Sequence, residues 1–200
     1  DFNRAMGIAS EKDGTTVNGV NDILKKSAVS TVFALFAAIG SAPCVGGAIA
    51  DCIGRRLAII AGGAIVALGG VLAACAGFAV NEPTTALVIL YLGRAVTGFA
   101  IGLLCAAVPL YQSEIAPIRW RGSITTFFQL SITLGILAVT VVNVHLIDVR
   151  HAWIYIFLLQ ALPAALLVGG TFLLPDSPRW LLLRQRPDEA ERALRQLRHA

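Results

Sequence analysis

Five apolar runs, each long enough to cross a bilayer, restrict this chain more than any other feature of its sequence. A transmembrane helix needs about 20 consecutive apolar residues. The runs cover residues 28–50, 57–80, 83–111, 123–147 and 152–174. Only 14% of the 200 residues are charged, whereas soluble domains have about 25%. The pattern predicts an all-α, multi-pass membrane protein whose five spans occupy residues 28–174.

The basic residues indicate how these spans are oriented. Arginines are concentrated in alternate loops, at 55–56, at 119–121 and from 179 onward, while the other loops carry nearly as many acids as bases. Loops rich in Lys and Arg stay in the cytoplasm. We therefore expect residues 1–27 to form an extracellular loop and residues 175–200 to begin a cytoplasmic linker with short helices. An outside N-terminus without a secretory signal leads us to expect one further span before residue 1.

Several function classes have no support in the sequence. The net charge of +4 is modest and follows the loops, so it does not suggest nucleic-acid binding. The four cysteines are scattered through apolar segments without metal-ligand spacing, which is typical of small buried hydrophobes. We find no nucleophile–base pair, phosphate loop or metal motif. The sequence therefore predicts neither an enzyme nor a bound cofactor or metal.

Three clusters, each with an acid at a span end and an arginine a few residues away, fall on the predicted cytoplasmic side. Their charged residues are Asp51, Arg55 and Arg56; Glu114 and Arg121; and Asp176 and Arg179. A guanidinium can hold a carboxylate with two hydrogen bonds, so the clusters favour a cytoplasmic gate that locks when closed. The alternative is that the arginines only retain these loops inside. In the second cluster, Pro109 and Pro117 are expected to limit helix continuation.

Arg94 is the only charged residue well inside an apolar run. A guanidinium in the bilayer costs about 2.5 to 3.5 kcal/mol, so Arg94 is expected to face a partner or a wet cavity. The alternative is that its side chain reaches back to the membrane surface. The nearby Gly98-x-x-x-Gly102 spacing predicts a close helix contact.

Gln129 is a polar side chain in another apolar run and shares a helix face with Ile132. An amide both donates and accepts hydrogen bonds, which suits a ligand with several hydroxyl groups. The alternative is a hydrogen bond between helices.

Four motifs in the same order resemble the sugar porter family of the major facilitator superfamily. They are G-x-x-x-D-x-x-G-R-R from Gly47, P-x-Y-x-S-E-I-A-P-x-x-x-R-G from Pro109, Q-x-x-I-T-x-G from Gln129, and P-D-S-P-R-W-L from Pro175. Asp176 stands where the family has Glu. The resemblance implies the N-terminal half of a helical-bundle transporter, without its first span.

The resemblance also implies roles for single residues. Gln129 would contact the sugar and Ile132 would line its cavity, while Arg94 would face an acid of the first span that carries the proton in coupled members. We therefore expect transport of a hexose-like sugar by alternating access at the plasma membrane, by proton symport or facilitated diffusion. Polyol, inositol or quinate transport, or a non-transporting nutrient sensor, are the alternatives. The expected partners are a sugar or polyol, protons, the bilayer, and the missing span and C-terminal half.

Overall fold

The computed structural model describes residues 16–76, 83–117, 119–146 and 152–199, and in these ranges it is helical without strands. The elements are α2 (Thr16–Ser41), the π-helix η1 (Pro43–Gly47), α3 (Ala48–Ile53), α4 (Arg55–Cys75), α5 (Pro83–Ile115), α6 (Arg121–His145), α7 (Ala152–Leu159), α8 (Ala161–Phe172), α9 (Pro178–Leu183) and α10 (Pro187–His199). Within these ranges, four segments are long and apolar enough to span a membrane, and the bent α2–η1–α3 segment makes a fifth. The predicted all-α membrane fold is confirmed.

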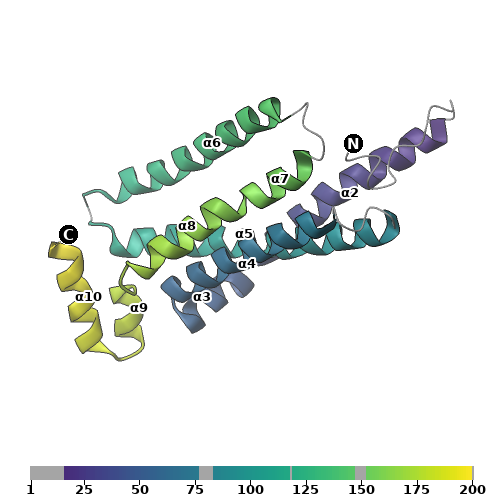
Figure 1. Cartoon of the computed structure of the whole chain (residues 1–200). Helices are drawn as coiled ribbons and strands as arrows, with labels where there is room; N and C mark the ends of the chain where they lie inside the picture. The colour runs from purple at the N-terminus through teal and green to yellow at the C-terminus, as the bar shows by residue number, and fades with distance from the viewer. Residues whose placement is uncertain (1–15, 77–82, 118, 147–151, 200) are drawn as a thin grey trace.

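The long helix α5 organises the bundle (Figure 1). It packs along both α2 and α4, and α4 in turn contacts α7 and α8. Helix α6 contacts mainly α5, and its membrane-length window is not buried within the bundle. The short helices α9 and α10 pack against each other beyond the end of α8, where α9 also contacts α5. The packed core is therefore formed by α2, α4, α5 and α8.

Small residues allow α2 and α5 to pack with their backbones in contact. At Gly98 a Cβ atom would overlap the carbonyl oxygen of Phe33, and at Gly102 it would overlap that of Ala37. Both carbonyls belong to α2. The close contact predicted from the Gly98-x-x-x-Gly102 spacing is therefore present, because glycine leaves room for the neighbouring backbone.

The first predicted span is a broken helix in the structure. α2 begins at Thr16, inside the segment predicted as an extracellular loop, and ends at Ser41. No proline interrupts the chain between these residues, so the helix extends beyond the apolar run. Pro43 then lacks the N–H that would continue the ladder. The chain bends by 52° there and passes through η1 into α3.

Three further prolines differ in their effect on the helices. The prediction that Pro109 limits its helix is wrong, because α5 continues through Pro109 to Ile115. A proline within a membrane helix removes one hydrogen bond but is tolerated where neighbouring groups compensate. Pro117 does follow the end of α5, as residues before proline avoid the helical region. Pro163 accompanies the break between α7 and α8 at Gln160.

Candidate functional site

The site begins with a sharp turn between α3 and α4. Gly54 ends α3 and precedes Arg55, and its φ of 103° and ψ of 148° belong to a region open essentially to glycine. The turn places Arg55 at the first position of α4, where it is buried with 5% exposure. From there the side chain lies 2.8 Å from Asp51, one helical turn earlier, through Nη2 and Oδ1.

Arg55 also pairs with Glu114 near the end of α5. The distances are 3.2 Å from Nε to Oε2 and 3.3 Å from Nη2 to Oε1. Only 6% of the Arg55 side chain and 3% of the Glu114 side chain are exposed. Of the buried guanidinium, Nη2 donates to the carboxylate, whereas Nε and Nη1 have no hydrogen-bond partner among the described residues. A buried pair of this kind leaves a costly unpaired charge when one partner is removed.

Ser177 connects this pair to α9. Its hydroxyl donates a hydrogen bond to Oε2 of Glu114, and the same oxygen caps α9 by accepting from the backbone N–H of Trp180 at 3.4 Å. Ser177 is fully buried. We refer to Asp51, Arg55, Glu114 and Ser177 as the acid–arginine network. It joins segments from α3, α4, α5 and the start of α9.

Arg56 forms a second connection beside the network. Its guanidinium donates to the backbone carbonyls of Thr171 at 3.2 Å and Phe172 at 2.7 Å. These are among the last carbonyls of α8, which have no partner within the helix and carry its negative dipole end. Arg56 also lies 4.0 Å from Asp176. The start of α4 is thereby tied to the end of α8.

The structure brings together most of the predicted gate residues but not all of them. Asp51, Arg55 and Glu114 meet in the network, and Arg56 reaches Asp176. Arg179 is exposed and makes no ion pair with any described residue. The side chain of Arg121 lies outside the described residues.

Sequence reasoning missed two contributors to this end of the bundle. Ser177 could have been found, because a serine followed by proline is a common start of a helix. Tyr111, whose hydroxyl donates to the carbonyl of Pro175 at 2.6 Å, belongs to the motif that begins at Pro109, but the motif does not indicate this contact.

Arg94 lies between aromatic rings rather than beside a carboxylate. Its guanidinium carbon is 5.6 Å from the ring centre of Phe33 on α2 and 4.7 Å from that of Phe157 on α7. Both distances fit cation–π contacts. Its Nε is buried without a hydrogen-bond partner among the residues described. The half-buried guanidinium can therefore still donate a hydrogen bond from Nε to an acceptor.

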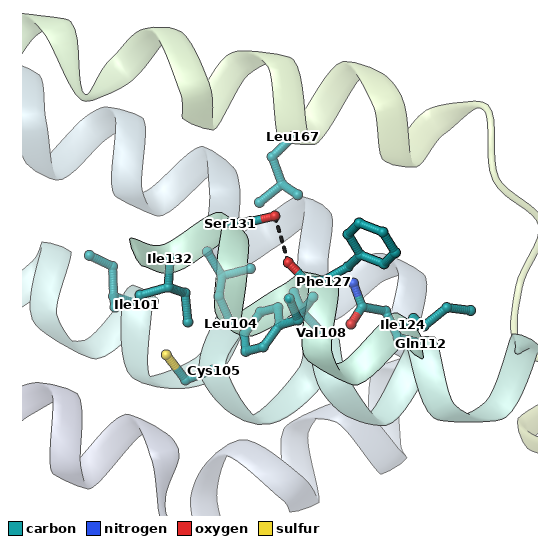
Figure 2. Close-up of a pocket in the computed structure, with 11 residues that line it drawn as sticks. Ile101, Leu104, Cys105, Val108, Gln112, Ile124, Phe127, Ser131, Ile132 and Leu167 are labelled. Atoms are coloured by element: carbon teal, nitrogen blue, oxygen red, sulfur yellow. Dashed lines mark hydrogen bonds between the residues drawn. The ribbon is translucent and has the colours of Figure 1, made fainter. Parts of the chain in front are cut away.

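The two predicted sugar-site residues lie in different surroundings. Ile132 lines a cavity of about 430 Å³ between α5, α6 and α8, whereas Gln129 is exposed and does not line it. Figure 2 shows Ile132 and Gln112 at this cavity, which is mostly apolar. The Ser131 hydroxyl donates to a carbonyl one turn earlier at 2.8 Å, so it is already satisfied. The other polar side chain of the lining, Gln112, has a buried Oε1 without a hydrogen-bond partner among the described residues, so one acceptor is available in a mostly apolar cavity.

Solved structures identify the class of protein that this fold represents. The proton:xylose symporter XylE of the major facilitator superfamily, bound to 6-bromo-6-deoxy-D-glucose, matches with a TM-score of 0.80 and 26% identity over 92% of this chain and 42% of that chain. XylE from E. coli in a partially occluded inward open conformation matches with a TM-score of 0.76 and 26% identity, over 85% and 42%. The chain is thus a multi-pass membrane protein with the major facilitator fold.

Sequence comparison then identifies the family. The family described as "Sugar (and other) transporter" matches residues 6–200, so the chain belongs to it, and the predicted sugar porter family is confirmed. The MFS-type transporter criB of Aspergillus cristatus is 38% identical over 86% of this chain and 36% of its own length. Sugar transport protein MST8 of rice, Oryza sativa subsp. japonica, is 37% identical over 72% and 27%. The glucose transporter GlcP of Staphylococcus epidermidis is 36% identical over 73% and 30%.

The chain spans about a third of the length of the curated relatives it matches. The relatives named above are transporters, a class that moves a solute without changing its covalent bonds.

Proposed function

We propose that this chain is part of a longer transporter that carries a hexose-like sugar across a membrane by alternating access. The acid–arginine network is the observation that carries the proposal. It joins α4, α5 and the start of α9, which are distant in sequence, through one buried ion pair and one buried hydroxyl, and Asp51 at the end of α3 pairs with the same arginine. Transporters of this type rock their helices around a central site, and a network of this kind can hold one end closed and release it. Membership of the sugar transporter family supports the same function.

The network end is proposed to face the cytoplasm of a plasma-membrane protein. Arg55, Arg56 and the arginines of α9 and α10 lie at this end. Because loops rich in arginine remain inside, the N-terminal end of the chain would lie outside and α10 in the cytoplasm.

Gln129 is proposed to bind the sugar, with Ile132 beside the substrate path. The exposed amide of Gln129 is free to donate and accept hydrogen bonds on a part of α6 that the described helices leave uncovered. Replacing Gln129 with Ala should raise the KM for sugar about tenfold, since an unsatisfied sugar hydroxyl costs roughly 1–3 kcal/mol. Thr140→Val is the matched control, because Thr140 lies on the same helix but bonds its hydroxyl to Ile136. Equal KM values for the two variants would remove Gln129 from the site.

Arg94 is proposed to take part in coupling to protons. Its Nε is buried and unpaired among the described residues, and a carboxylate placed against it would gain or lose a proton according to the state of the transporter. The relative XylE is a proton:xylose symporter by name.

The deciding experiment measures radiolabelled hexose uptake by the complete protein in cells that lack their own hexose transporters, with and without a proton uncoupler. Uptake that collapses with the uncoupler supports symport, and uptake that survives it supports facilitated diffusion. No hexose uptake, despite correct surface expression, would overturn hexose transport. A parallel test with inositol, other polyols and quinate would then show whether another solute is carried, and binding without uptake would indicate a sensor.

A further inference from the structure

We propose that Trp180 and Arg184 are positioning residues that hold α3 in place and thereby keep the acid–arginine network closed. We call these two residues the α9 clamp. Trp180 lies within α9, and Arg184 follows its last residue. The inference rests on the proposed function, because it assigns a role in opening and closing one end of the transporter.

The clamp bonds to the backbone at the end of α3. Trp180 donates from Nε1 to the carbonyl of Asp51 at 2.8 Å. Arg184 donates from Nη2 to the carbonyl of Cys52 at 2.6 Å and lies 3.3 Å from that of Asp51. The Arg184 guanidinium also lies over the Trp180 ring at 5.5 Å. The two side chains therefore act as one unit on the same two carbonyls.

These carbonyls are the groups that a short helix leaves without partners. The last four carbonyls of a helix accept no hydrogen bond from an N–H of the same helix, and they carry partial negative charge. α3 has only six residues, which is too short to be stable alone. Donors at its C-terminus therefore contribute a large share of what keeps it helical.

The other end of α3 is joined to a bent and irregular segment. It follows the π-helix η1 and the 52° bend at Pro43, and π-helical segments and proline bends interrupt the regular ladder. Ala50 of α3 is buried in one apolar cluster with Ala107 and Tyr111 of α5, so packing holds the middle of α3 while hydrogen bonds hold its far end. The α9 clamp is at that far end.

The position of α3 determines whether the network can form. Asp51 carries both the clamped carbonyl and the carboxylate that pairs with Arg55. The Trp180 ring packs 3.3 Å from the point where a Cβ of Gly54 would lie, so it also covers the turn that aims Arg55. Ser177, at the start of α9, bonds to Glu114. The α9 segment thus contacts α3 through Trp180 and Arg184, and it contacts α5 through Ser177.

Electron-spin distances between α3 and α9 test the clamp directly. Nitroxide labels are placed on native Cys52 and on a Leu182→Cys substitution, with Cys44, Cys75 and Cys105 changed to Ala, in the complete protein in lipid nanodiscs. Both labelled positions are exposed. Trp180→Phe keeps an aromatic side chain but removes the Nε1 donor and part of the indole ring, and Arg184→Gln removes the charge. The clamp bonds lie at the exposed surface, and each substitution should enlarge a longer-distance population about tenfold, as expected for loss of one hydrogen bond.

Arg195→Ala is the matched control, because Arg195 pairs with Glu191 on the exposed face of α10. It should leave the distances unchanged. A distance distribution in Trp180→Phe and Arg184→Gln that matches the unsubstituted protein would overturn the clamp. If α9 itself unfolds, the label mobility at position 182 reports it, and Trp180→Phe, the milder change, decides the question.

The apparent KM for sugar transport is a second measurement. It should not change if Trp180 and Arg184 only stabilise the fold. Loss of the clamp lowers the share of molecules closed at this end, so the apparent KM for external sugar should rise while surface expression stays constant. Arg184→Lys, which restores one charged donor, should recover part of the KM, whereas equal KM values in all variants would contradict the role. Altered distances in a protein that transports no sugar would leave the clamp standing and overturn the proposed function instead.

Discussion

At the scale of single residues, Arg55 and Glu114 form a buried ion pair in which the mutual attraction of the charges roughly offsets the cost of removing them from water. Two nearly inaccessible charges face each other at 3.2 and 3.3 Å, and Ser177 satisfies a further lone pair of the carboxylate. Taking both charges out of water is costly, so the pair adds little net stability compared with apolar residues. Its value lies in specificity, because Arg55 and Ser177 both reach Glu114 only when α4, α5 and the start of α9 are packed together.

Glu114→Ala should lower the free energy of unfolding by about 3–5 kcal/mol, because it leaves the Arg55 guanidinium buried without its partner. The measurement is denaturant unfolding in mixed micelles, followed by circular dichroism. Glu191→Ala serves as control, since its pair with Arg195 is 64–72% exposed and such pairs contribute about 1 kcal/mol or less. Similar losses for both variants would show that Glu114 is not buried against a charge.

Gly54→Ala should destabilise the protein by about 1–3 kcal/mol, because a φ of 103° with a ψ of 148° is closed to residues with a Cβ. The added methyl would also press on the Trp180 ring. Gly47→Ala is the control, since Gly47 has helical angles and open space around it, and it should be neutral or slightly stabilising. Unfolding measurements that rank the two variants the other way would contradict the positive φ.

At the scale of elements, the helices are arranged by small residues at their contacts and by prolines along their length. Where α2 and α5 meet, glycine permits backbone contact, and the nearby core is built largely of alanine, including Ala100 and Ala107. Close contacts of this type strengthen dispersion and leave smooth helix faces. Pro43 bends a span, whereas Pro109 does not end one. The effect of a proline depends on whether neighbouring groups compensate for the lost hydrogen bond.

Gly102→Ala should separate α2 from α5 and cost about 1–3 kcal/mol, because its Cβ would meet backbone that cannot rotate away. Gly135→Ala on α6 has open space and should be neutral or stabilising. Thermal unfolding in the same detergent compares the two variants. A lower melting temperature for Gly135→Ala than for Gly102→Ala would show that the α2–α5 contact is not as close as described.

At the scale of the whole molecule, one end of the bundle collects nearly all the charged contacts. The ion pairs of Arg55 and Arg56 and the helices α9 and α10 lie there, while the apolar lengths of α4, α5, α6 and α8 extend away from it. A membrane protein with this asymmetry has one preferred orientation, because arginine-rich segments are retained in the cytoplasm.

Two native cysteines test that orientation. Cys52 lies at the network end and Cys75 ends α4 at the other, and both are exposed. With Cys44 and Cys105 replaced by Ala, a membrane-impermeant maleimide should label Cys75 in intact cells and label Cys52 only after permeabilisation. The opposite pattern would reverse the proposed orientation.

The sequence by itself determined the class of fold and the family. It also placed several acids and arginines at one side of the membrane, without showing which of them pair. The apolar runs predict membrane helices because the bilayer requires them, and the acid and arginine motifs place Arg55 and Glu114 at the ends of spans on one side. Periodicity and spacing are local properties, so they can be recognised without a structure.

Tertiary structure alone decided which of those charges meet. Arg55 pairs with Glu114, 59 residues away, while Arg179 remains exposed and Ser177, to which the sequence assigned no role, completes the site. It also decided that Ile132 lines the cavity between α5, α6 and α8 while Gln129 does not. The physical reason is that burial and hydrogen-bond geometry depend on how helices pack, and packing joins residues that no local pattern connects.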